Sequence, residues 1–253
     1  MFPIYLFIAC WTFSSCTKVI DVNLNSKDPQ YVIEGVVTLG ETTHQVKITR
    51  TLNLNESVAY PTVGDAIVFL TDDLGNNVEL EHAGQGTYQV SNYQIHEGRT
   101  YTVSVTIGSK IFQATSTVPP LVQMDTLTTF PFSFGPASIN ALVPVRFDIP
   151  DIANYYQFNL FEKGIQKRGV YIQNDDFNDG NIMLEPIFSD SIDSGDTITV
   201  EMYCIDKPIY KYFYTLLQNI SGSTPANPTS NFSGGRLGYF SARTKDVKKV
   251  IIP

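Results

Sequence analysis

The run Asn174–Gly180 has the composition of a cation-binding loop. Its candidate ligands are Asp175, Asp176, Asn178 and Asp179. Calcium takes about six to eight oxygen ligands, so short carboxylate and amide side chains beside a glycine turn could surround this ion. The helix–loop–helix calcium pattern is not matched, because the third position counted from Asp175 is Phe177 and the twelfth is Pro186 instead of glutamate. A solvated hairpin loop is the competing interpretation, since Asp, Asn and Gly also form turns without a metal.

Carboxylates in the second half of the chain could also support a hydrolase that acts on glycan or peptide. A glycosidase-type mechanism needs two acids that face each other across a cleft. The candidates by position are Glu162, Asp175, Glu185 and Glu201. No serine stands in a G-x-S-x-G setting, and His44, His82 and His96 do not pair at zinc-ligand spacing. We therefore expect the histidines on the surface or on edge strands, and the sequence predicts no catalytic residue and no resident cofactor.

The first fifteen residues, MFPIYLFIACWTFSS, predict a signal peptide. They form an apolar segment that suits a signal-peptide core and is short of the roughly 20 residues that span a bilayer. The segment leads into Ser14-Ser15-Cys16, which is similar to the bacterial lipobox. We therefore expect residues 1–15 to be removed, Cys16 to carry lipid, and residues 16–30 to form a tether between the membrane and a folded domain.

Two further features bear on this interpretation of the N-terminus, one against it and one for it. The segment lacks the Lys or Arg that normally opens a signal peptide, which leaves a start upstream of Met1 open, and a buried hydrophobic strand is the alternative. The cysteine count fits lipidation, because Cys10 would leave with the signal and Cys16 would be modified. Cys204 then has no cysteine partner and is expected to be a buried, inert thiol.

Composition excludes one large class of function. The net charge is −8 and the pI is near 4.8, whereas nucleic-acid binding requires a concentrated positive surface. The local group Lys245, Lys248 and Lys249 is typical of a solvated strand end. No nucleic-acid partner is expected.

Short strands separated by turns predict a mainly β protein. Over residues 31–118 their spacing indicates an immunoglobulin-like antiparallel β-sandwich. Its clearest hairpin alternates from Thr100 to Ile107, turns at Gly108-Ser109 and returns over Lys110–Thr117. Residues 119–143 predict a linker with one strand of its own. Residues 144–253 predict a second β-rich domain, closed by two strands at Gly238–Ala242 and Val247–Ile252.

One helix is expected near residues 207–220. Asp206 can cap it and Pro208 suits its first turn. The residues that would share its buried face are Ile209, Tyr212, Phe213, Leu216, Leu217 and Ile220. The loop Gly222–Gly235 that follows is either a contact surface or an ordinary connection. As contact residues the sequence offers Asn227, Asn231 and Tyr239.

The order of several short motifs resembles a family of Bacteroidota outer-membrane lipoproteins that is defined by a domain of unknown function. The motifs are Cys16–Asp21, Tyr31–Gly35, Gly98–Tyr101, Asn154–Tyr156, Asp175–Phe177, Pro225–Pro228, Gly234 and Gly238–Ala242. The resemblance implies an outer-membrane location, an N-terminal immunoglobulin-like sandwich and association with a TonB-dependent outer-membrane β-barrel transporter. It implies no activity and no catalytic residues. Which face of the membrane the protein occupies stays open.

The sequence thus favours a non-enzymatic envelope lipoprotein that is an accessory or ligand-binding partner of such a transporter. Two alternatives remain at this point: a carboxylate-based hydrolase, and a purely structural envelope protein.

Overall fold

The computed structural model describes residues 29–52, 59–134, 137–189, 192–222, 226–234 and 237–253. In these ranges the chain is mainly β, with one helix, as the sequence predicts. The predicted signal peptide, the lipidation residue Cys16 and nearly all of the tether lie outside the described residues.

The first unit is a seven-stranded antiparallel array. Its strands are β1 (Tyr31–Thr38), β2 (His44–Arg50), β3 (Ile67–Asp72), β4 (Asn77–Gly84), β5 (Thr87–Val90), β6 (Thr100–Ile107) and β7 (Lys110–Thr117). They follow each other in space as β1-β2-β5-β4-β3-β6-β7. The predicted hairpin is confirmed, because Ile107 pairs with Lys110 across the two-residue turn and every second residue of β6 is buried.

A single apolar core fills this unit. Its fully buried side chains include Ile33, Ile48, Val68, Val103 and Val105 from strands of the first unit. Phe232, Phe240 and Ala242 also belong to it, although they come from the C-terminal end of the chain. Burial of this apolar surface is the main stabilising contribution. The core of the first unit therefore includes residues from the C-terminal end of the chain.

Residues 119–143, which the sequence predicts to be a linker with one strand, form most of a long β-hairpin instead. Strands β8 (Met124–Phe134) and β9 (Ala137–Phe147) pair antiparallel along their length, and β13 (Ile182–Met183) adds to β9. The physical reason lies in the inner residues, since Met124, Leu127 and Leu142 are buried in the second core. Proline and glycine lower strand propensity here, and tertiary burial overrides that preference.

The second unit packs this three-stranded sheet against one face of a larger one. That sheet contains β10 (Tyr155–Glu162), β11 (Ile165–Gln166), β12 (Tyr171–Asn174) and β14 (Thr197–Ile205). Tyr156, Phe158 and Leu160 of β10 point into the core between the two sheets. The intervening residues of β10 and β14 point to the opposite face, where the helix lies.

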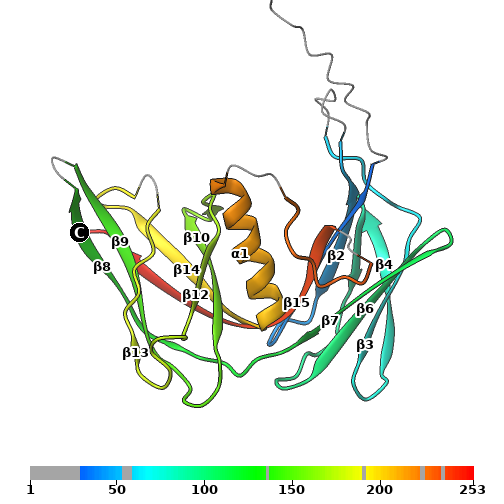
Figure 1. The fold of residues 1–253 in the computed structure, drawn as a ribbon, viewed down its shortest axis with the longest axis horizontal. Helices are drawn as coiled ribbons and strands as arrows, with labels where there is room; N and C mark the ends of the chain where they lie inside the picture. Colours follow the sequence, from blue (N-terminus) through cyan, green and yellow to red (C-terminus); the bar gives the residue numbers. More distant parts are fainter. Residues whose placement is uncertain (1–28, 53–58, 135–136, 190–191, 223–225, 235–236) are drawn as a thin grey trace, which may run out of the picture.

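One strand joins the two units. The sequence predicts two closing strands, but residues Leu237–Ile251 form the single continuous strand β15. Its first half pairs parallel with β1, and its second half pairs antiparallel with β14 (Figure 1). The two halves bury their even-numbered residues on the same side, so both cores lie on one side of the shared strand.

The helix α1 (Lys207–Ser221) lies across the other side of β15, between the two units (Figure 1). Asp206 caps it as predicted, accepting a hydrogen bond of 3.2 Å from the Ile209 amide. Ile209, Tyr212 and Phe213 are buried against the sheet, whereas Ile220, which the sequence places on the buried face, is 70 % exposed. Periodicity alone therefore overestimates the buried face at the C-terminal end of the helix. Within the described residues, no helix has the length and apolar content needed to cross a membrane.

Candidate functional site

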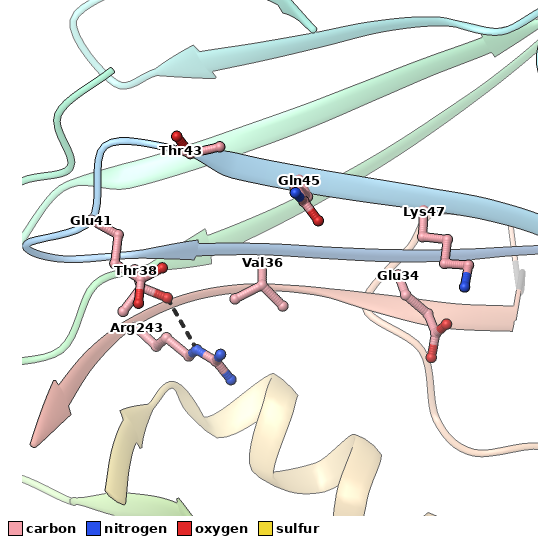
Figure 2. A pocket seen from close by; sticks show the side chains of 8 residues that line it. All are labelled: Glu34, Val36, Thr38, Glu41, Thr43, Gln45, Lys47 and Arg243. Atoms are coloured by element: carbon pink, nitrogen blue, oxygen red, sulfur yellow. Dashed lines mark hydrogen bonds between the residues drawn. The ribbon is translucent and has the colours of Figure 1, made fainter. Parts of the chain in front are cut away.

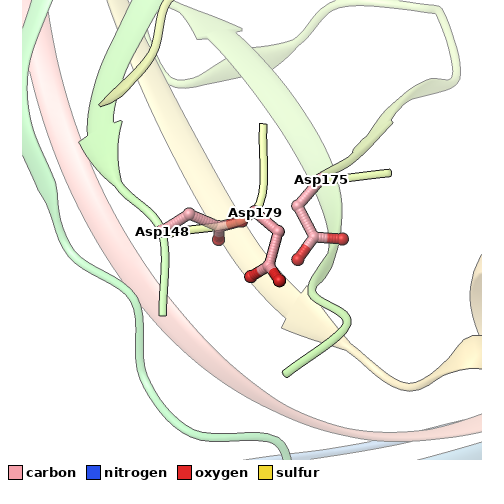
Figure 3. A group of neighbouring side chains, drawn as sticks. All are labelled: Asp148, Asp175 and Asp179. Atoms are coloured by element: carbon pink, nitrogen blue, oxygen red, sulfur yellow. The ribbon is translucent and has the colours of Figure 1, made fainter. Parts of the chain in front are cut away.

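Three carboxylates converge from two segments of the chain, one after β9 and one after β12. Asp148, Asp175 and Asp179 each place one oxygen so that the three oxygens lie within 4.8 Å of one another (Figure 3). Asp148 and Asp175 are buried, at 5 % and 2 % exposure, while Asp179 reaches solvent. Two of the three belong to the run that the sequence singles out, and Asp148 joins them from the segment directly after β9.

Backbone structure fixes each member of this acidic cluster. Asp148 follows the last residue of β9, and its amide donates to the carbonyl of Asn181 at 3.2 Å. Asp175 follows β12, and one of its carboxylate oxygens accepts hydrogen bonds from the backbone and side-chain nitrogens of Asn154, at 2.8 and 3.3 Å. Asp179 accepts from the Asp151 amide at 3.1 Å.

The turn directly after Asp179 requires a glycine. Gly180 has φ +70°, and a Cβ there would lie 2.8 Å from the side chain of Pro150. An L side chain would therefore meet both an unfavourable backbone conformation and a steric clash. The Asp-Gly pair, which suggests an ordinary turn in the sequence, also closes this loop against the segment after β9.

Burial and charge repulsion perturb the cluster. The pKa of Asp148 is raised to about 6, first because burial disfavours the charged form and then because of the neighbouring Asp175. The hydroxyl of Tyr156 donates to Oδ1 of Asp148 and opposes this shift. Arg146, which is fully buried with its guanidinium 4.1 Å from the Tyr156 ring centroid, opposes it as well. Burial and the neighbouring Asp175 therefore both disfavour the ionised form of Asp148.

The two other residues of the predicted calcium loop take no part in the cluster. Asp176 accepts a hydrogen bond of 2.6 Å from the side chain of Asn174, and the amide of Asn178 donates to the Asp175 carbonyl in a turn. Asp148 was not identified by sequence reasoning. Its only signal is an acidic residue directly after an apolar strand, in Phe147-Asp148-Ile149-Pro150, which is common at strand ends.

A second concave surface lies on the outer side of β1 and β2. It is a groove of about 450 Å³ that opens toward helix α1 (Figure 2). The lining residues are Glu34, Val36, Thr38, Glu41, Thr43, Gln45, Lys47 and Arg243. Strand alternation explains this set, because Ile33, Gly35 and Val37 face the core and the residues between them face the groove.

Arg243 anchors one end of this groove. Its guanidinium lies 3.5 Å from the ring centroid of Tyr203, and its Nε donates to Thr38 Oγ1 at 3.3 Å. Burial lowers the pKa of Arg243 from its usual range, and the neighbouring tyrosines act in the opposite direction. Lys245 forms an ion pair with Glu41 at the same end. The groove therefore presents charges of both signs, with Glu34, Glu41, Lys47 and Arg243 in its lining.

Residues 17–249 match a protein family described as a domain of unknown function, DUF4249. The chain belongs to this family. The match covers nearly the whole chain, both β units and the shared strand included. No curated protein shows significant similarity to the chain.

Two of the carboxylates considered for hydrolysis, Glu162 and Glu201, do not face each other in this DUF4249 protein. Glu201 pairs with Asn159, and Glu162 is three residues further along β10, so the two glutamates lie on opposite faces of the sheet. Glu162 forms ion pairs with Lys163 and Lys167. Asp175 lies in the acidic cluster, and burial raises the pKa of Glu185.

One histidine is not where the sequence predicts it. His44 begins β2 and is buried, whereas His82 and His96 are exposed. Nδ1 of His44 accepts from the Thr38 amide at 3.4 Å, and Nε2 lies 3.0 Å from the Tyr93 carbonyl. A neutral imidazole with its proton on Nε2 satisfies both contacts, and burial lowers the pKa of His44. Its interior position is possible because both ring nitrogens have partners.

The predicted contact residues of the late loop have different environments. Asn227 is exposed. The side chain of Asn231 donates to the carbonyls of Thr115 and Phe240, at 3.0 and 2.8 Å, and accepts from the Phe240 amide. Tyr239 packs against Tyr212 and Phe213 with ring centroids 4.9 and 5.1 Å apart. The segment around Asn231 thus bridges β7 and β15 over the first core.

Cys204 is buried in the second core, as expected. Its sulfur accepts from the Val122 amide at 3.4 Å, and burial raises the pKa of the thiol. A thiol of this kind is a poor nucleophile.

The outer face of the three-stranded sheet carries several exposed apolar side chains. Phe130, Ile139, Phe147 and Ile182 share this face by strand register, and each is 40 % or more exposed. Phe188 joins them through a ring contact of 5.1 Å with Phe132, and Leu184 continues the surface beyond Ile182. We call these exposed residues the outer sheet face. Phe177, 96 % exposed, lies beside it along a hollow that it shares with Ile182 and Leu184.

Proposed function

We propose that this protein is a non-enzymatic cell-envelope lipoprotein, anchored to the outer membrane through Cys16, and an accessory or ligand-binding partner of a TonB-dependent outer-membrane transporter. The anchor rests on the sequence Ser14-Ser15-Cys16 after an apolar leader. The choice of partner rests on the resemblance of the ordered motifs to outer-membrane lipoproteins.

The outer sheet face is the feature of the structure that best supports a binding role. Six apolar side chains are exposed on and beside the three-stranded sheet, whereas the exposed apolar residues of the first unit, such as Ile67 and Ile111, lie on different strands. Exposed apolar side chains gathered on one face support an interaction site, since leaving them in water is costly. Its aromatic residues also fit an interface, where Phe is enriched.

The groove beside α1 supports a role in holding a ligand. Its volume of about 450 Å³ is in the range of small-molecule sites. Glu34 and Lys47 face each other across β1 and β2, and Arg243 closes one end, so the lining suits a polar molecule that carries both charges or several hydrogen-bonding groups.

Crosslinking of native membranes tests the partner. We expect gentle detergent extraction to recover the protein with a β-barrel transporter in a fixed ratio. Phe147→Ser combined with Phe130→Ser should abolish this recovery, because both changes remove exposed apolar area from the outer sheet face without touching a core. Recovery of the wild-type chain alone, at native expression, would contradict the proposal.

A matched control uses exposed apolar residues of the first unit. Leu74 and Ile111 are 69 % and 64 % exposed and lie outside the outer sheet face. The double change Leu74→Ser and Ile111→Ser should leave the crosslinked complex intact. Equal loss in both double variants would point to a general effect on the fold instead of a specific surface.

A further inference from the structure

We infer that Asp148, Asp175 and Asp179 form a binding site for one divalent cation, with calcium as the ion of best fit. The inference does not rest on the proposed function. It starts from the convergence of three carboxylate oxygens within 4.8 Å of one another. Two oxygens bound to one calcium ion lie at most about 5 Å apart, since each calcium–oxygen distance is about 2.3–2.6 Å.

A second observation points to a ligand at this position. Asp148 is 5 % exposed, and its Oδ2 has no hydrogen-bond partner among the described residues. Its other oxygen, Oδ1, accepts from the Tyr156 hydroxyl, so Oδ2 is the atom left for a ligand. A buried acceptor without a partner is costly, and a cation between the carboxylates removes that cost.

The charge balance favours a divalent ion. Three carboxylates meet here, and the nearest buried cation is the single guanidinium of Arg146, which Glu185 also faces. At least two negative charges therefore remain uncompensated when all three carboxylates are ionised. A shared proton between Asp148 and Asp175 would relieve only one of them, and it would leave Asp179 without a role.

The positions of the other oxygens fit the same site. Asp175 and Asp179 each use one oxygen to accept from the backbone, which orients the carboxylates and leaves the second oxygen of each for a ligand. Asp179 is exposed, so the site is open to solvent on one side. Calcium tolerates such an irregular, partly hydrated shell, whereas magnesium demands a near-octahedral one.

The site would also hold the loop that presents Phe177. This residue lies between the ligands Asp175 and Asp179 in the chain, and it is 96 % exposed beside the outer sheet face. Cation binding would fix both ends of a short loop, which links the acidic cluster to that surface.

Thermal unfolding of the full chain, freed of metal by a chelator, tests the inference. At calcium concentrations about one hundred times Kd, the midpoint should rise by about 5 °C or more, and a chelator should reverse the rise. Magnesium at the same concentration should give a smaller rise. No shift in millimolar calcium would overturn the inference and leave the shared proton as the explanation.

Two variants make the test specific. Asp179→Asn removes a ligand charge at an exposed position, so the fold should persist while the calcium-dependent rise is lost. Asp176→Asn makes the same chemical change three residues earlier, at a carboxylate that faces Asn174, and should keep the full rise. An equal calcium response in both variants would show that the ion binds elsewhere.

Terbium provides a direct readout that does not depend on stability. It substitutes for calcium, and its luminescence can be excited through a nearby tyrosine. Tyr156 donates to Asp148 and is placed for this transfer. The wild-type chain and Asp176→Asn should show sensitised emission that added calcium displaces, and Asp179→Asn should lose it. Emission that survives in Asp179→Asn would count against the site.

Discussion

The carboxylate of Asp206 accepts a hydrogen bond of 2.8 Å from the hydroxyl of Ser116, ninety residues earlier in the chain. The same carboxylate accepts from the Thr117 amide at 3.1 Å and caps helix α1 through the Ile209 amide. Ser116 in turn accepts from the Ala242 amide of β15. One acidic side chain therefore links the last strand of the first unit to the helix of the second.

Replacing Asp206 by alanine should lower the free energy of unfolding by about 2–3 kcal/mol, because the variant loses a helix cap and a charged hydrogen bond across the units. Urea denaturation measures the change. Asp206→Asn keeps a capping side chain and should lose less. In a double-mutant cycle, Asp206→Ala and Ser116→Ala should be less than additive; full additivity would mean that the two residues do not interact.

Gly238→Ala should disrupt the pairing of β1 with β15. Gly238 has φ +98°, and a Cβ there would overlap the backbone of Ile33, its partner in the parallel register. Gly75→Ala is the matched control, because Gly75 has φ +86° and open space around it. We expect a loss of about 1–2 kcal/mol for the control, from the backbone conformation alone, and at least twice that for Gly238→Ala. Equal losses by denaturant titration would show that the close approach is absent.

The unfolding free energy should fall as pH drops below about 6.5, through the histidine at position 44. Burial lowers the pKa of His44 in the folded state, so the unfolded chain takes up the proton first. The stabilising contribution is therefore present above the unfolded pKa and is lost as the pH falls toward the folded one. His44→Gln should flatten the stability profile between pH 5.5 and 7.5, roughly the range in which histidine titrates. His96→Gln, at an exposed position, is the control, and an unchanged profile in His44→Gln would contradict the assignment.

Cys16→Ala should release the protein from the membrane fraction. Lipid on this thiol supplies the apolar chains that hold a folded domain at a bilayer. Fractionation followed by mass spectrometry of the N-terminal peptide measures both location and modification. Cys10→Ala should change neither, because residue 10 lies within the predicted signal peptide. A Cys16→Ala protein that stays with the membrane and is still cut after Ser15 would rule out the anchor.

Local patterns predict those elements whose structure depends on neighbouring residues. The β6–β7 hairpin follows from strict alternation and Gly108-Ser109, and α1 follows from Asp206, Pro208 and its apolar face. The β8–β9 hairpin could not be predicted in this way. Its strands contain Pro131 and Pro144, which disfavour a strand, and they form because their inner residues are buried against β10 and β14.

The sequence likewise predicts only some of the residues in the acidic cluster. Asp175 and Asp179 stand in a run whose composition suggests oxygen ligands, so sequence reasoning finds them. It also selects Asp176 and Asn178, because composition does not say which side chains of a turn point inward. Asp148 comes from a strand end 27 residues before Asp175, and only the packing of β9 beside that loop brings them together.

By itself, the sequence determined the mainly β class, the β6–β7 hairpin, the capped helix and family membership, since these depend on alternation, turn residues and motif order. Only the tertiary structure decided that β15 serves both units, that residues 119–143 are a hairpin, and that three distant aspartates meet. Those features arise from burial and strand pairing between segments far apart in the chain, where local propensity carries no information.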